Sequence, residues 1–169
     1  MLKSLLILLT LLLVALPAAA KNYSLADGTV SFDAPDSWPA IMEKTNGDPQ
    51  FYAFQIRNPR STETLTRITV TTHEMRKVTD FDAFVKQTLT KARNSSGFSE
   101  LPEQLTAGNS LHYQFDQDGQ PQSVRLSLFQ HGHQAIVLRC QHPQKAKASR
   151  QWLADYRAGC KRLAAQLGD

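Results

Sequence analysis

The feature of this chain that most constrains its fold is an alternation of apolar and polar side chains between residues 110 and 141. Two glycine turns, Asp118-Gly119 and His131-Gly132, interrupt the alternation and divide it into three predicted strands. These strands span residues 110–116, 122–130 and 133–141. Because the connections are short, neighbouring strands must pair antiparallel. A further strand is predicted at residues 104–107, before a turn at Gly108-Asn109.

The same alternation predicts which side chains of this meander are buried. Nine are expected to face inward: Leu111, Tyr113, Phe115, Val124, Leu126, Leu128, Ile136, Leu138 and Cys140. Burial contributes roughly 1.5–3 kcal/mol for each large apolar side chain. We therefore expect this face to provide the largest single favourable contribution to folding.

Two other segments follow a helical period. Apolar residues recur at helical spacing over residues 80–94 and again over residues 146–167. In the second segment the apolar stripe consists of Trp152, Tyr156, Cys160, Leu163 and Leu167. Gly159 lies inside this predicted helix, where glycine costs up to ~1 kcal/mol relative to alanine. Packing must therefore override the poor helix propensity of that residue.

Four strands are predicted before the first helix, over residues 23–26, 29–33, 51–57 and 66–75. The order of strands, helix, strand meander and helix is typical of an α+β domain. We therefore predict an antiparallel sheet with a central helix and a C-terminal helix packed on it.

The N-terminal twenty residues have the pattern of a secretory signal peptide. Lys3 precedes an apolar run over residues 5–16, and Pro17 is followed by Ala18-Ala19-Ala20, a small-residue cleavage site. The run is too short for a comfortable membrane span. We expect a signal peptide over residues 1–20, one periplasmic domain over residues 21–169, and no transmembrane segment after cleavage.

The two cysteines are Cys140, on a predicted strand, and Cys160, on the helix that follows. Both fall on inward faces, and two cysteines in an oxidising compartment form one pair with no remainder. A redox pair favours the Cys-x-x-Cys spacing, and a zinc site needs four ligands. The sequence therefore predicts a structural disulfide between Cys140 and Cys160.

Composition and motifs argue against several functions. The net charge of +4 becomes +3 when Lys3 is removed with the signal peptide, a small excess for a nucleic-acid-binding protein. The sequence contains no serine-nucleophile elbow, phosphate-binding loop or zinc-protease motif. His131 and His133 are the candidates for a transition-metal site, but their spacing matches no recognised ligand frame. We expect no enzyme activity, no cofactor and no nucleic-acid partner.

A protein-binding surface is the more specific expectation. The face opposite the predicted inward residues is mostly polar and has one exposed aromatic residue. Residues 139 to 162 carry seven basic residues and one acidic residue. Such a face and such a charge cluster suit recognition of a protein partner. The candidate residues are His112, Gln114, Arg125, Ser127, Phe129, Arg139, Lys145, Lys147 and Arg150.

The segment Phe32-Asp33-Ala34-Pro35-Asp36-Ser37-Trp38 resembles the strand followed by Pro-x-x-Trp at the entry of PsbP-like domains. The helix that begins Asp80-Phe81-Asp82-Ala83-Phe84, the late meander and the closing helix are also similar in order. That superfamily includes the photosystem II extrinsic subunit and DcrB-type envelope proteins. The resemblance implies a sandwich of sheet and helices with a non-catalytic binding or adaptor role, and no catalytic residues.

These observations favour a secreted binding protein. One version is an immunity protein that neutralises a toxin delivered to the periplasm, and another is an envelope-maintenance adaptor. The alternatives are a periplasmic carrier of a small ligand or metal, and a hydrolase that uses no recognisable motif. The sequence leaves the oligomeric state open.

Overall fold

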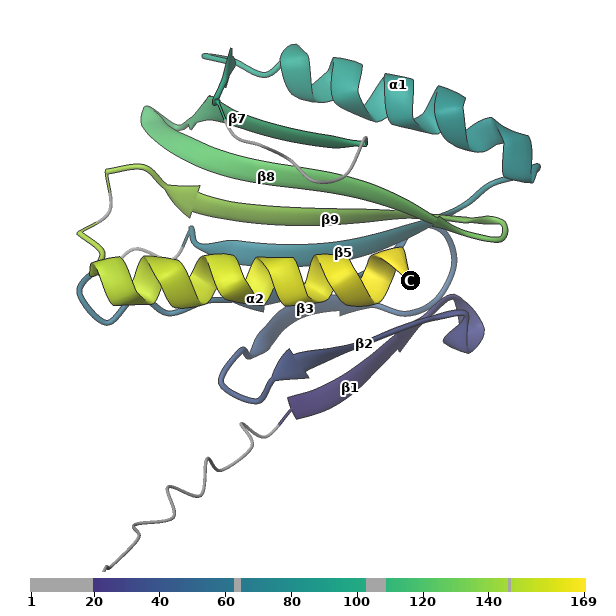
Figure 1. Ribbon diagram of the computed structural model, residues 1–169, viewed down its shortest axis with the longest axis horizontal. Coiled ribbons are helices and arrows are strands. Elements are labelled where there is room, and N and C mark those ends of the chain that lie inside the picture. Colours follow the sequence, from purple (N-terminus) through teal and green to yellow (C-terminus); the bar gives the residue numbers. More distant parts are fainter. Residues whose placement is uncertain (1–19, 63–64, 103–108, 146) are drawn as a thin grey trace, which may run out of the picture.

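The computed structural model describes residues 20–62, 65–102, 109–145 and 147–169 (Figure 1). The expected signal peptide, apart from residue 20, lies outside the described residues. So does the strand predicted at residues 104–107. The remaining predicted elements can be compared with the structure directly.

Within these described residues, the main sheet is antiparallel throughout and has seven strands; Figure 1 shows its arrangement. In spatial order these are β3 (Ala40–Lys44), β4 (Gln50–Gln55), β5 (Arg67–Glu74), β9 (Gln134–Pro143), β8 (Gln120–His131), β7 (Ser110–Gln117) and β6 (Ser99–Glu100). The predicted meander is therefore confirmed as β7, β8 and β9. Strand β3 was not predicted, because all five of its residues are exposed and show no alternation.

A second, two-stranded sheet pairs β1 (Ala20–Leu25) with β2 (Val30–Pro35), joined by the short helix η1 (Ala26–Gly28). The predicted central helix is α1 (Phe81–Arg93), preceded by the single turn η2 (Val78–Asp80), and the C-terminal helix is α2 (Arg150–Gly168). These elements confirm the α+β class, with an antiparallel sheet, a central helix and a C-terminal helix.

The two helices cover opposite faces of the sheet. Ile136, Leu138 and Cys140 pack in one apolar cluster with α2 and the β1–β2 hairpin. Val137, which points to the other side of β9, packs instead with α1 and with the apolar residues of β7 and β8. The arrangement is a sandwich, with α2 in front of the sheet in Figure 1 and the hairpin in the same apolar cluster as α2.

The prediction that the nine inward residues of the meander share one face is therefore wrong. Arg125 on β8 pairs with Cys140 on β9, and Leu126 pairs with Arg139. Because directly opposed residues lie on the same side of a sheet, the apolar residues of β9 face away from those of β8. Both faces of the sheet are covered by helices, so an apolar side chain on a strand does not show which face it occupies.

The disulfide between Cys140 and Cys160 is present, with the two Cα atoms 6.4 Å apart. It joins β9 to the buried face of α2, and both cysteines are almost fully buried. Helix α2 begins at Arg150, later than predicted, because the Ser149 side chain caps it by accepting a hydrogen bond from the Trp152 amide at 3.1 Å. Among the described residues, no helix has the length and apolarity needed to span a membrane.

Candidate functional site

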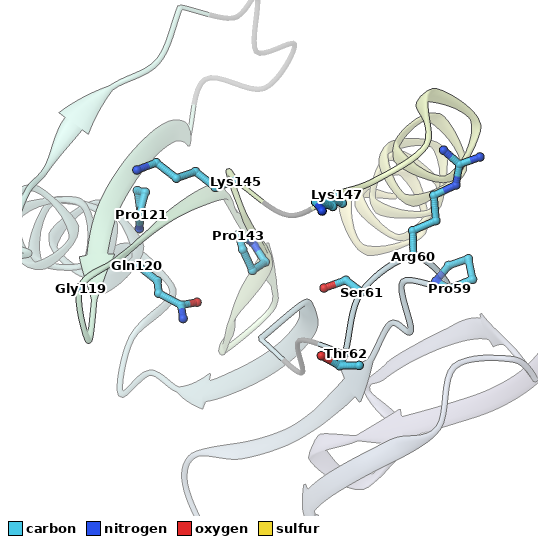
Figure 2. Close-up of a pocket in the computed structure, with 10 residues that line it drawn as sticks. All are labelled: Pro59, Arg60, Ser61, Thr62, Gly119, Gln120, Pro121, Pro143, Lys145 and Lys147. Atoms are coloured by element: carbon cyan, nitrogen blue, oxygen red, sulfur yellow. The ribbon is translucent and has the colours of Figure 1, made fainter.

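An open cleft of about 720 Å³ lies at one end of the main sheet. Three segments distant in sequence line it: the loop after β4, the turn between β7 and β8, and the residues at and after the end of β9 (Figure 2). The lining residues are Pro59, Arg60, Ser61, Thr62, Gly119, Gln120, Pro121, Pro143, Lys145 and Lys147. We refer to this hollow as the basic cleft.

Hydrogen bonds hold the walls of the basic cleft. Asn58, which is buried, donates from Nδ2 to the Lys147 carbonyl oxygen at 3.2 Å and accepts the Arg60 amide on Oδ1 at 3.1 Å. The Trp152 indole donates to the Arg57 carbonyl oxygen at 3.0 Å, which ties the same loop to the first turn of α2. The loop that carries Arg60 is thus anchored to the segment that carries Lys147.

The basic cleft concentrates positive charge. Arg60 and Lys147 lie on one side of it and Lys145 on the other, and all three side chains are exposed (Figure 2). No aspartate or glutamate is among the described residues that line it. A hollow lined by charge of one sign focuses the electrostatic potential and attracts groups of opposite charge.

The positive charge continues along α2. Arg150, Arg157 and Lys161 are exposed and follow one another at helical spacing, so they lie along one face of the helix. We call these three residues the α2 basic stripe. It starts beside the basic cleft, at the first residue of α2.

The residues predicted to bind a partner do not form one surface. Lys145 and Lys147 line the basic cleft and Arg150 opens the α2 basic stripe. By strand register, His112, Gln114, Arg125, Ser127 and Phe129 lie on the face of the sheet that α2 covers. Arg139 lies on the opposite face, because it pairs with Leu126. The prediction of a shared face is wrong, and the binding role of each residue stays a prediction.

Several polar members of this set bond to neighbouring side chains. A ring nitrogen of His112, Nε2, lies 3.0 Å from Ser123 Oγ, and Gln144 Nε2 donates to Gln114 Oε1 at 2.8 Å. Phe129, expected to be exposed, is instead half-buried against the cluster beneath α2. The covering helix explains the difference, because Phe129 contacts the C-terminal end of α2 near Gly168.

The two candidate metal ligands lie at the turn between β8 and β9. His133 is exposed, and its Nδ1 lies 3.2 Å from the Met75 carbonyl oxygen. Within the part of the chain that the structure describes, no three histidine, cysteine, aspartate or glutamate residues are grouped so that they could hold a metal ion. The expectation that the protein uses no cofactor stays a prediction.

A second hollow, of about 820 Å³, lies on the other face of the sheet, between α1 and strands β5 and β9. Its basic residues are Arg67, His73, Lys91 and Arg139. Burial is the main cause that lowers the pKa of His73, Lys91 lowers it further, and Asp48 acts in the opposite direction. We call this hollow the α1 groove.

Sequence reasoning missed most of the basic residues in these hollows. On β5, Arg67 and His73 alternate with the buried Ile68, Val70 and Thr72, as an alternating strand over residues 66–75 implies. The alternation of residues in this strand was therefore enough to place Arg67 and His73 on the face away from those buried residues. What the sequence did not show is that Lys91 and Arg139 face the same space from other elements.

The fold and the two hollows define a disulfide-linked α+β protein with two separate basic surfaces. No protein-family model matches the chain, and no curated protein matches it. Among solved structures, protein PA94 of Pseudomonas aeruginosa, a protein of unknown function, is similar at 16% identity, with a TM-score of 0.46 over 87% of this chain and 94% of that chain. LpqN of Mycobacterium tuberculosis, which is involved in cell envelope biogenesis, is similar at 12% identity, with a TM-score of 0.37 over 89% of this chain and 83% of that chain. None of these comparisons assigns the chain to the PsbP-like superfamily, so that resemblance stays a prediction.

Proposed function

We propose that the protein is a non-catalytic binding protein of the periplasm, and that it recognises an acidic surface of a partner protein. The observation that carries the proposal is the basic cleft, which presents three exposed cations and no acidic side chain among its described lining residues. The α2 basic stripe extends the same charge along a rigid helix. A partner with clustered aspartate or glutamate residues has the complementary charge.

The disulfide supports the compartment in this proposal. Structural disulfides persist in secreted and periplasmic proteins and are rare in the reducing cytosol. Both an immunity protein that occludes a periplasmic toxin and an envelope-maintenance adaptor fit this description. The hydrolase alternative makes a different prediction, namely an activity that disappears when a single acidic or hydroxyl residue is replaced.

Site-specific photo-crosslinking in intact cells tests the proposal. A photoreactive amino acid at position 157, on the α2 basic stripe, is expected to crosslink one discrete acidic protein. The matched control places the same amino acid at Lys86, which is exposed on α1, on the opposite face of the sheet. We expect the crosslink at position 157 to disappear in Lys145→Glu/Lys147→Glu, and to weaken as salt is added.

Three outcomes would contradict the proposal. The first is the absence of a discrete crosslink at position 157, and the second is an equal crosslink at position 86. The third is that purified protein binds vesicles of anionic lipid, with Lys145→Glu/Lys147→Glu abolishing that binding, while no protein is crosslinked. The basic cleft would then recognise a membrane surface.

A further inference from the structure

The α1 groove contains two arginines whose Nε atoms are buried and have no hydrogen-bond partner among the described residues. Arg67 on β5 and Arg139 on β9 both point to the α1 side of the sheet, and among the described residues neither Nε atom has a hydrogen-bond acceptor. Burying a charged donor without an acceptor is costly, and native proteins leave few such groups. These two atoms therefore favour an acceptor that the described residues do not supply.

The two arginines are close enough to act together. Arg139 pairs directly with Thr69, and Arg67 pairs with Gln141 two positions along the same pair of strands. Such diagonal neighbours lie roughly 7–8 Å apart, within the reach of two long side chains. One carboxylate or phosphate group can therefore accept hydrogen bonds from both guanidinium groups.

An aromatic contact orients one of these groups. The guanidinium carbon of Arg139 lies 5.2 Å from the centre of the Phe115 ring. A cation–π contact of this kind favours a guanidinium held over the ring face, and the Arg139 Nε–H has no acceptor among the described residues. The Arg139 side chain is thus preorganised for an anion.

The charge of the α1 groove has one sign along its length. Lys91 on α1 belongs to the lining together with Arg67 and Arg139, and no acidic residue is among its described lining residues. Lys91 is exposed at the rim of the groove. An anion entering the groove therefore meets cations from both the helix and the sheet.

Apolar and aromatic side chains make up part of the remaining lining, and uncharged polar residues of β5, α1, β7 and β9 make up most of the rest. The apolar part includes Phe84, Tyr113, Phe115, Leu126 and Val137. Ligand pockets typically measure about 300–1,000 Å³ and combine an apolar lining with a few polar groups that fix orientation. The volume of the α1 groove, about 820 Å³, lies in this range.

We infer that the α1 groove binds a small organic anion, with its carboxylate or phosphate held by Arg67 and Arg139 and its apolar body packed against Phe84 and Phe115. This site is separate from the basic cleft and does not depend on the proposed protein partner. It gives the protein a ligand-carrying role in addition to partner binding.

Calorimetric titration with three related probes tests the inference. Naphthoate presents a carboxylate, naphthyl phosphate presents a phosphate, and naphthalenemethanol is a neutral analogue of similar shape. We expect one of the two anions to bind about tenfold or more tightly than the alcohol, because charge-assisted hydrogen bonds are stronger than neutral ones. The tighter anion identifies the head group. Inorganic phosphate is expected to bind at least tenfold more weakly than that anion.

Variants then locate the site. Arg67→Gln and Arg139→Gln are each expected to weaken anion binding by about tenfold or more. Lys91→Gln, at the exposed rim, is expected to weaken it by a few-fold without disturbing the fold. Lys86→Gln is the matched control, because this exposed lysine on α1 does not line the groove. Lys91→Gln keeps the test decisive if either arginine variant fails to fold.

The inference would be overturned if neither anion bound more tightly than the alcohol, or if inorganic phosphate bound as tightly as the organic anions. Equal binding by Lys91→Gln and Lys86→Gln would also overturn it. Lys145→Glu/Lys147→Glu is expected to leave probe binding unchanged, and Arg139→Gln is expected to leave the crosslink at position 157 unchanged. The two proposals therefore fail independently.

Discussion

The indole ring of Trp38 lies directly against Gly159 in the middle of α2. A Cβ atom built on residue 159 would lie 2.6 Å from Cζ2 of Trp38, which is far inside van der Waals contact. The Trp38 amide donates to the Pro35 carbonyl oxygen at 2.9 Å, and this turn carries the indole from the end of β2 into the core. The Pro-x-x-Trp segment and the helix glycine thus form one packing unit.

This contact predicts that Gly159→Ala destabilises the protein, although alanine is the better helix former. Forcing a methyl group into a filled core costs about 1–3 kcal/mol. At this chain length each kcal/mol lowers the melting temperature by roughly 2–4 °C. The measurement is thermal unfolding of Gly159→Ala, with Ala158→Gly at the neighbouring exposed position as a control for helix propensity.

A double-mutant cycle separates packing from propensity. In a Trp38→Leu background the added methyl group has more room, so Gly159→Ala is expected to cost less than it does in the wild-type protein. An identical cost in both backgrounds, or a higher melting temperature for Gly159→Ala alone, would show that the indole does not require glycine here.

Because of the disulfide, we expect the stability of the protein to depend on redox conditions. Cys140→Ser is expected to lower the free energy of unfolding by roughly 3 kcal/mol under oxidising conditions, because the bond between Cys140 and Cys160 closes a loop of about twenty residues. With a reducing agent present, the wild-type protein should lose most of this advantage. Two reactive thiols in the native protein would contradict the bond itself.

The predictable and unpredictable parts of this fold differ in physical origin. The meander, α1, α2 and the cysteine pair follow from alternation, helical spacing and glycine turns, which are local properties of the chain. The face occupied by Cys140 depends on what covers each side of the sheet, and that is decided by contacts distant in sequence. The sequence of a half-buried strand shows the same alternation whether α1 or α2 packs on its buried face.

The candidate sites also contain some residues that are close in sequence and others that only the fold brings together. The sequence singled out Lys145, Lys147 and Arg150 because they are close together along the chain. It did not single out Arg60, which reaches the basic cleft from the loop after β4. Arg67 and Arg139 are more than seventy positions apart, and only the pairing of β5 with β9 makes them neighbours.

Removing the N-cap of α2 is expected to destabilise the protein. Ser149 Oγ accepts the Trp152 amide at 3.1 Å, so Ser149→Ala removes the acceptor for that amide. Substitutions of this kind cost about 0.5–2 kcal/mol. Ser149→Asp keeps a capping oxygen and is expected to retain most of the stability. Equal melting temperatures for Ser149→Ala and the wild-type protein would rule out the capping role.

The lowered pKa of His73 predicts that the protein loses stability as the pH falls. Burial lowers its folded-state pKa below the ordinary value of 6.5, Asp48 opposes this shift, and Lys91 adds to it. The unfolded chain therefore binds a proton at this site more readily than the folded protein does. The stability that the neutral imidazole contributes is fully present above pH 6.5 and is lost as the pH falls through the folded-state pKa.

The measurement compares the melting temperature of the wild-type protein with that of His73→Gln, from above pH 6.5 down to about pH 5. Both proteins share the other titrating groups, so their difference isolates His73. We expect the wild-type protein to lose more stability on acidification than His73→Gln. Lys91→Gln should give a smaller loss than the wild-type protein, because removing the nearby cation brings the folded-state pKa closer to 6.5. A steeper acid loss in His73→Gln would reverse the sign and contradict the burial of this ring between β5 and Phe84, whose ring centre lies 5.1 Å from it.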